Sequence, residues 1–435
     1  MQVLINKVRV LDKQSDFNDK VVDITITDGT IVTITEQNKK SAKTAPSIVA
    51  EGKEVWKGNA GEELLVSNGW VDVFADYREP GLEHKETIAT GLSAAAAGGF
   101  TDVLLLPNTQ PAVSSKSVIQ FVLGKAIGNV VSLHALGTVT ANAEGKELAE
   151  MMDMYANGAT AFTDGWKPIQ NANLMLKALE YVKAFGGTVL QMPVDAPLAA
   201  GGLMNEGAVS TALGMPGIPL LAETLMLYRD IELLRYTNSK LHITGISSAV
   251  AVEMIRKAKK EKLNISCSVT PYHLALTEDM LNTYDSAYKV TPPLRSEADR
   301  LALIKGLEDG TIDCIATHHR PHEWDAKTKE FEYAADGMAV QEIAFNIVWD
   351  TLKDYLSIER ITEVLAEAPR KLFGLKTDAI AKGGVASLTL FSATGKHTLT
   401  TASKKSAAMN NPFIGKALAG AVIGIFNNSK LNLNK

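Results

Sequence analysis

Cysteine is scarce in this chain of 435 residues, which has only Cys267 and Cys314. Both lie in apolar segments and lack the spacing of a zinc knuckle, so we exclude a disulfide-rich scaffold and expect buried free thiols. Charge of one sign is weak as well, because the net charge is −5. The composition therefore indicates no nucleic-acid partner.

Long apolar runs are also missing. The longest mainly apolar stretches, Gly91–Phe100 and Ala417–Phe426, fall short of the ~20 residues that cross a bilayer. The N-terminal residues Met1–Lys13 alternate apolar and polar side chains and have no apolar centre of a signal peptide. We therefore expect a cytoplasmic protein that makes no membrane contact.

The chain does contain enough apolar residues, 46%, to bury a large core. Eight apolar segments alternate with helical patterns such as Ala172–Phe185 and Val250–Lys262. The predicted strands are residues 69–74, 101–107, 131–137, 159–164, 188–194, 240–246, 264–270 and 313–319. Near-continuous apolar strands between helices are typical of a (β/α)8 TIM barrel, which we place at residues 69–374.

The two ends of the chain have a different pattern. Residues 1–55 read as short strands with a hairpin turn at Asp28–Gly29, and strand patterns return within residues 375–435. We expect both ends to form one small β-sandwich domain. The segment 56–68 is predicted to be a linker.

Catalytic groups of such barrels lie at the carboxyl ends of the strands, and the motifs there are specific. They include Arg78-Glu79-Pro80-Gly81, Pro107-Asn108-Thr109, Val269-Thr270-Pro271-Tyr272-His273, Pro292-Pro293-Leu294-Arg295 and Asn411-Pro412-Phe413-Ile414-Gly415. With these motifs, the chain resembles the dihydroorotase family of the amidohydrolase superfamily over nearly its whole length. The resemblance implies the barrel, the β domain from both termini, and a place in pyrimidine biosynthesis, where active relatives interconvert carbamoyl-aspartate and dihydroorotate. It also implies that Arg78 and Asn108 bind a substrate carboxylate.

The chain departs from the family at the metal site. The resemblance implies His-x-His where this chain has Phe74 and Asp76, and further histidines where it has Met192 and Gly245. His318 stands at the position of the general-base aspartate. The fourth-strand aspartate remains as Asp164, but the Asp-Gly that follows it in the family is Gly165-Trp166 here.

These replacements matter because an amide resists attack by water. A metal ion lowers the pKa of bound water from about 15.7 to about 7, and no single side chain supplies that activation. Phenylalanine, methionine and glycine are not metal ligands. We therefore predict no catalytic residue, no metal and no cofactor.

A rearranged site remains an alternative. Asp76, Asp164 and His318 are legitimate ligand types and would hold one zinc ion in an active cyclic-amide hydrolase. The structural interpretation is that Asp76 and His318 pair with each other in a vacated pocket. For Arg78, ligand binding and pairing with Asp76 or Asp164 are both open.

The preferred prediction is a non-catalytic dihydroorotase-like protein, a pseudoenzyme. Its resemblance implies a structural or regulatory partnership with aspartate carbamoyltransferase or another dihydroorotase. A homodimer and a small acidic ligand are further expectations.

Overall fold

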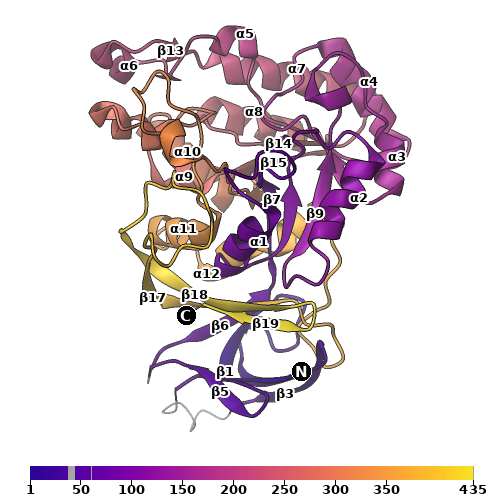
Figure 1. Ribbon diagram of the computed structural model, residues 1–435, viewed down its shortest axis with the longest axis vertical. Coiled ribbons are helices and arrows are strands. Elements are labelled where there is room, and N and C mark those ends of the chain that lie inside the picture. The colour runs from indigo at the N-terminus through magenta and orange to yellow at the C-terminus, as the bar shows by residue number, and fades with distance from the viewer. Residues whose placement is uncertain (38–44, 60, 435) are drawn as a thin grey trace.

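The computed structural model describes residues 1–37, 45–59 and 61–434 (Figure 1). Eight parallel strands follow one another around a sheet in the order β7, β8, β9, β10, β11, β14, β15, β16. A bridge between Ala75 and His319 brings the first strand beside the eighth, so that the barrel is nearly closed. The predicted (β/α)8 barrel is confirmed. Its strands are β7 (Trp70–Ala75), β8 (Phe100–Leu105), β9 (Ser132–Gly137), β10 (Ala159–Phe162), β11 (Val189–Gln191), β14 (Leu241–Thr244), β15 (Ile265–Val269) and β16 (Cys314–Ile315).

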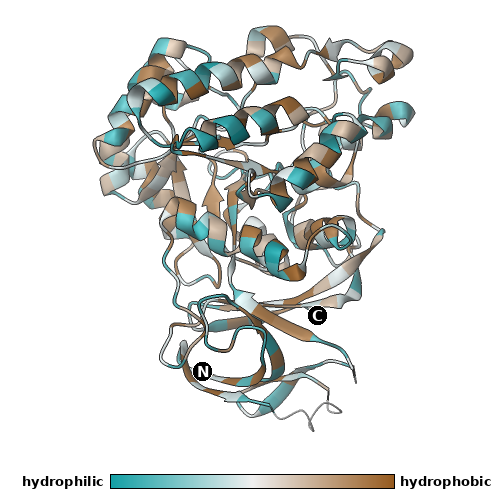
Figure 2. Cartoon of the chain, turned by 180° about the vertical axis from the view of Figure 1, so that it is seen from behind, coloured by the Kyte–Doolittle hydropathy of each residue, from teal (hydrophilic) through white to brown (hydrophobic). Residues whose placement is uncertain are grey.

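Helices cover the outside of the barrel and turn their polar faces to solvent (Figures 1 and 2). The helices between strands include α1 (Ile88–Ala97), α2 (Lys116–Lys125), α3 (Met151–Ala156), α4 (Ala172–Lys183), α7 (Leu221–Thr237), α8 (Ala249–Lys260) and α10 (Glu297–Glu308). After β16 come α11 (Ala344–Leu352), α12 (Ile358–Leu365) and α13 (Glu367–Phe373). Within the described ranges, no helix has the length and apolar character needed to cross a membrane.

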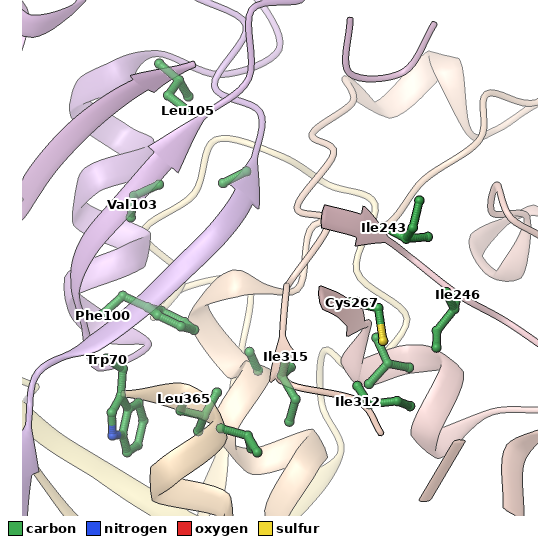
Figure 3. Close-up of a cluster of buried hydrophobic side chains, with 14 of the residues drawn as sticks. Trp70, Phe100, Val103, Leu105, Ile243, Ile246, Cys267, Ile312, Ile315 and Leu365 are labelled. Carbon is green, nitrogen blue, oxygen red and sulfur yellow. The ribbon is translucent and has the colours of Figure 1, made fainter. Parts of the chain in front are cut away.

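Apolar side chains fill both faces of the barrel strands, as continuous apolar segments require. Between the strands and the helices lie Trp70, Phe100, Ile243, Cys267 and Ile315, which Figure 3 labels. A separate cluster fills the barrel interior and contains Val71, Val73, Phe74, Leu104, Leu136, Leu190 and Cys314. Both cysteines are buried and free, as expected. The interior cluster matters for function because it reaches up to Phe74, close to the mouth of the barrel.

The strands of the two termini pair in one curled sheet of order β19-β18-β17-β6-β1-β2-β3, with β4 and β5 attached through β1 (Figure 1). Inward-facing residues such as Ile5, Ile24 and Leu390 form its own apolar core. The predicted union of both ends is confirmed. The strands are β1 (Gln2–Leu11), β2 (Val21–Thr27), β3 (Thr30–Glu36), β4 (Ser47–Ala50), β5 (Lys53–Lys57), β6 (Leu64–Asn68), β17 (Leu388–Thr398), β18 (Ala417–Asn427) and β19 (Lys430–Leu433).

The segment 56–68 is not merely a linker, and this prediction is corrected. Its residues Leu64–Asn68 form β6, which is wholly buried. β6 pairs in parallel with β1 and antiparallel with β17. The apolar Leu64-Leu65-Val66 follows a polar, glycine-containing stretch, and one of its two partner strands, β17, lies at the far end of the chain. A local pattern gives no sign of such a pairing.

The lower end of the barrel is held by Arg370 of α13. Its guanidinium donates to the carbonyl of Gly69 at 3.0 and 2.9 Å and pairs with the Asp102 carboxylate. Asp102 also contacts His134 Nε2 at 2.8 Å. Burial alone raises the pKa of Asp102, but the hydrogen bond from His134 and the charge of Arg370 outweigh it and lower that pKa. α13 is therefore tied to the first two barrel strands by a buried ion pair.

Candidate functional site at the barrel mouth

Three aromatic rings occupy the centre of the barrel mouth. Phe74, at the end of β7, stacks on the His318 ring with centroids 4.3 Å apart, and the Trp166 indole meets Phe74 edge-on at 5.2 Å. The indole also lies 5.6 Å from His318. Phe74 is completely buried and belongs to the interior apolar cluster. The rings close the top of the barrel core at the place where the family resemblance implies metal ligands.

His318 is held by its own neighbours. Its Nε2 lies 2.7 Å from the Thr244 hydroxyl, and its Nδ1 has no partner among the described residues. Gly245 makes room for the ring, because a Cβ there would come within 2.6 Å of His318 Cε1. Burial, followed by nearby positive charge, holds the pKa of His318 well below its ordinary value. The neutral ring is therefore a weak base at physiological pH.

Asp76 is fully buried and has partners at both carboxylate oxygens. Oδ1 accepts the Arg78 backbone N–H at 2.9 Å. Oδ2 accepts the indole N–H of Trp166 at 2.8 Å and lies 3.0 Å from Arg78 Nη1. The pairing of Arg78 with Asp76, one of the two alternatives from the sequence, is thus present. The predicted pair between Asp76 and His318 is wrong, since each side chain has other partners.

Asp164 follows β10 and caps a neighbouring turn. Its Oδ1 accepts the backbone N–H groups of Val139 and Thr140 at 2.9 and 3.0 Å, and its Oδ2 accepts the Thr140 hydroxyl. Burial raises the pKa of Asp164 to about 6, although these hydrogen bonds favour the charged form. The carboxylate is committed to the backbone of the loop after β9.

Asn108 serves the same turn from the other side. Its Nδ2 donates to the Asp164 carbonyl at 3.0 Å, and its Oδ1 accepts the Trp166 backbone N–H at 3.1 Å. Gly165, with φ of +58°, fits against this amide, because a Cβ there would lie 1.9 Å from Asn108 Oδ1. Asn108 therefore fixes the turn that presents the Trp166 indole to Asp76.

A second polar cluster lies at the seam between the first and eighth strands, and sequence reasoning missed it. The Asp72 carboxylate accepts the Thr317 N–H at 3.0 Å and the Gln341 amide at 2.7 Å. His319 Nε2 lies 3.5 Å from Glu86. The contacts of Asp72 therefore join the first strand to the segment that follows the eighth strand.

The three candidate metal ligands do not fit a metal ion. In Asp76 and in Asp164, both carboxylate oxygens accept hydrogen bonds from groups within the protein. The His318 ring is stacked on Phe74. Met192, where the sequence resemblance implies a histidine, is buried. In the part of the chain that the structure describes, no group of three or more His, Cys, Asp or Glu side chains is arranged to hold a metal ion. The side chains at the barrel mouth thus differ from the set of metal ligands in a hydrolytic metal centre.

The cationic side chains of the mouth are less fully engaged. Arg78 is buried, yet its Nε and Nη2 have no hydrogen-bond partner among the described residues. Arg320, two residues after His318, lies over the Trp166 ring at 4.5 Å, and its Nε is likewise buried without a partner. Beside the indole is a cavity of about 460 Å³ whose lining includes Lys167, Met192 and Thr291. Sequence reasoning singled out Arg78 but gave no role to Trp166 or Arg320.

The fold has close counterparts among solved structures. An L-hydantoinase from Arthrobacter aurescens aligns over 99% of this chain and 96% of its own, with a TM-score of 0.82 and 21% identity. A D-hydantoinase aligns with a TM-score of 0.80 at 18% identity, over 100% and 95% of the two chains. At these identities the likeness shows the fold alone.

Sequence comparison is more specific. Residues 63–250 match the "Dihydro-orotase-like" family model. A dihydroorotase of Syntrophus aciditrophicus is 36% identical over 97% of both chains, and one of Acetivibrio thermocellus is 37% identical over 97% of this chain and 96% of its own. With such identity along nearly its full length, the chain belongs to the dihydroorotase family.

Proposed function

We propose that this chain is a non-catalytic dihydroorotase-like protein of pyrimidine biosynthesis. The supporting observation is that the carboxylates at the barrel mouth already have partners within the protein. Both oxygens of Asp76 and of Asp164 accept internal hydrogen bonds. Phe74 and Met192 offer no ligand atoms for a hard or borderline cation. Without metal activation, attack of water on a ring amide lacks its nucleophile.

A second candidate is an active cyclic-amide hydrolase with zinc on Asp76, Asp164 and His318. The names of the relatives favour it, because curated proteins 36–37% identical to this chain are dihydroorotases. Against it stand the internal partners of both carboxylates, which would have to be given up together. Breaking buried charge-assisted hydrogen bonds costs several kcal/mol.

One preparation tests both candidates. The protein is purified without added metal, its zinc content is measured, and dihydroorotate hydrolysis is assayed with and without zinc. The dihydroorotase of Syntrophus aciditrophicus serves as the positive control. We expect less than stoichiometric zinc and no hydrolysis above background. Turnover that a chelator abolishes would overturn the proposal and establish the second candidate.

We further propose that the protein acts as a structural or regulatory partner of aspartate carbamoyltransferase or of an active dihydroorotase. The retained barrel and terminal sheet support a scaffold role, since the fold is preserved where the donor set is not. Affinity purification from the native cell, with the mass of the purified chain measured in solution, tests this. Recovery of neither enzyme would refute the partnership. The mass in solution shows whether the chain forms the expected homodimer.

A further inference from the structure

A groove of about 560 Å³ lies between the barrel and the sheet built from both termini. Its lining comes from the C-terminal half of α1, the loop at 128–130, and the whole of the last strand, β19 (Lys430–Leu433). The loop at 128–130 precedes β9, whereas the barrel mouth is built from segments that follow the strands. The groove is therefore separate from the site described above.

β19 is attached to the barrel at both of its ends. The Lys430 ammonium donates to the carbonyl of Gly128, and the Asn434 amide donates to the carbonyl of Ala97 at 2.8 Å. Between these contacts the strand runs along the groove. The part of α1 that lines the groove includes Ser93, whose small side chain leaves room for another chain.

The strand has backbone groups on an open edge. Within the described residues β19 pairs only with β18, in antiparallel orientation, and lies at the edge of the terminal sheet (Figure 1). The Asn434 N–H donates to the Ile423 carbonyl at 2.9 Å. Bonded and non-bonded positions alternate in an antiparallel ladder, so Leu431 and Leu433 direct their N–H and C=O groups away from β18.

These outward groups make β19 a template for a further strand. The hydrogen bonds between segments of the described chain include none from the N–H groups of Leu431 and Leu433. An open edge of this kind recruits an extended peptide through main-chain hydrogen bonds. With four residues, β19 offers pairing over about 13 Å.

The charge of the groove selects the kind of peptide. Lys405 and Lys430 line it, and among the described residues no aspartate or glutamate does. Lys405 is exposed, and the Lys430 ammonium has a carbonyl as its partner, so neither charge is neutralised within the groove. A chain that carries carboxylates is complementary to this surface. The β19 edge of a second copy would instead place lysine beside lysine.

We propose that the edge of β19 binds an extended, acidic segment of a partner protein as an additional strand of the terminal sheet. The backbone of that segment pairs with Leu431 and Leu433, and its carboxylates lie beside Lys405 and Lys430. The groove has the volume of a binding site for a short segment. This inference does not depend on whether the barrel catalyses a reaction.

The test uses calorimetric titration of the full chain with capped six-residue peptides. The probe alternates valine and glutamate, so that one face of the added strand is apolar and the other acidic. One control carries N-methyl groups on the backbone of its valines, and another has lysine in place of glutamate. We expect the probe to bind at least about tenfold more tightly than either control.

Each control addresses one part of the proposal. Equal binding of the N-methylated peptide would overturn strand addition, because that peptide lacks the N–H groups on one edge. Equal binding of the lysine peptide would overturn the selection by charge. No binding of the probe at millimolar concentration would overturn the proposal as a whole.

Hydrogen exchange locates the bound peptide. The probe should slow exchange of the Leu431 and Leu433 amides, because these N–H groups gain acceptors on binding. Mass spectrometry of the segment 430–434, with and without the probe, measures this. Unchanged exchange in this segment at saturating probe would show that the peptide binds elsewhere and overturn the assignment.

Variants assign the groups that bind. Lys405→Glu should weaken the probe at least about threefold, whereas Lys53→Glu, the same charge change on the exposed edge strand β5, should leave its affinity unchanged. Leu433→Pro removes one outward N–H and should weaken the probe at least about tenfold. If thermal melting shows that Leu433→Pro is unfolded, the N-methylated peptide tests the same hydrogen bonds on the intact chain. Unchanged probe affinity in Lys405→Glu would refute the role of this lysine.

The outcome is independent of the test of catalysis. The peptides contain no cyclic amide, and the groove contains no residue of the barrel mouth. Hydrolysis of dihydroorotate would remove the proposed function and leave peptide binding at β19 intact. Failure of the probe to bind would leave the proposed function as it stands.

Discussion

Phe74 shows how one residue changes the character of a site. The side chain continues the apolar interior of the barrel upward and supplies a flat face for His318, at 4.3 Å between centroids. A histidine at this position would put ring nitrogens where the present structure packs carbon. The mouth has become part of the hydrophobic core at this point.

Replacing Phe74 tests that interpretation. Phe74→Ala should lower the free energy of unfolding by about 3–5 kcal/mol, because the ring is fully buried and its removal leaves a cavity. Phe74→Leu should cost less, since it refills most of the volume. Urea unfolding followed by circular dichroism measures both. A loss below about 1 kcal/mol for the alanine variant would show that the ring is not packed as described.

Asp164 gives a prediction for pH. Burial raises its pKa in the folded chain to about 6, above the ordinary 3.8. Between these values the folded state holds a proton that the unfolded state has lost. Stability from this group is therefore complete below about pH 4 and falls as pH rises through about 6, by up to about 3 kcal/mol.

Asp164→Asn should remove that loss, because an amide has no proton to lose in this pH range and its oxygen still accepts the Val139 and Thr140 N–H groups. The Thr140 hydroxyl, which donates to the carboxylate, would have to accept from the amide NH₂. The variant's unfolding free energy should then depend less on pH between about 4 and 7 than the wild type's. Asp16→Asn, at an exposed position, is the control. Equal pH dependence of all three proteins would contradict the assignment. Asp230, whose pKa burial also raises to about 6, contributes independently.

At the scale of elements, α13 is attached to the barrel by charge as well as by packing. Arg370→Ala leaves the buried Asp102 carboxylate with His134 and without its arginine. We expect a loss of about 3–5 kcal/mol, typical of a buried pair deprived of one partner. The double change Arg370→Ala with Asp102→Asn should recover part of it. Chemical denaturation of the wild type, Arg370→Ala, Asp102→Asn and the double variant tests this, and additive effects of the two substitutions would contradict a direct interaction.

Some elements follow from the sequence and others do not. The predicted strand 69–74 appears as β7 (Trp70–Ala75), and 101–107 as β8 (Phe100–Leu105), because an unbroken apolar run is what a strand covered on both faces requires. β6 was missed because Leu64–Asn68 is short and its partner β17 belongs to the other end of the chain. Pairing of that kind leaves no trace in local composition.

At the barrel mouth, too, some features could be predicted from the sequence and others could not. The order of motifs located Phe74, Asp76, Arg78 and His318 at strand ends, since that depends only on where strands stop. The hydrogen bond from Trp166 to Asp76 and the stacking of Arg320 on Trp166 depend on rotamers set by three different loops. No spacing rule predicts them. The substitution of Asp-Gly by Gly165-Trp166 was the available signal, and its meaning emerges only with Asp76 beside it.

At the scale of the whole molecule, the described residues include no set of side chains arranged to hold a metal ion, so we expect chelators to leave the stability of the protein unchanged. A metal that binds only the folded state stabilises that state by several kcal/mol when the metal concentration is far above the dissociation constant, and the melting temperature rises as a result. The melting temperature of this protein should therefore be the same with and without EDTA. The dihydroorotase of Syntrophus aciditrophicus provides the comparison. A reproducible fall in the melting temperature with EDTA, reversed by zinc, would contradict the prediction.

The sheet built from both termini has a consequence for synthesis in the cell. β6 emerges from the ribosome early, but Leu388, which pairs with Asn68, is made 320 residues later. At about 5–20 residues per second, the edge of β6 waits roughly 15–60 s for β17. An unpaired apolar strand edge is prone to aggregate, so the nascent N-terminal hairpins depend on protection until the last strands are released.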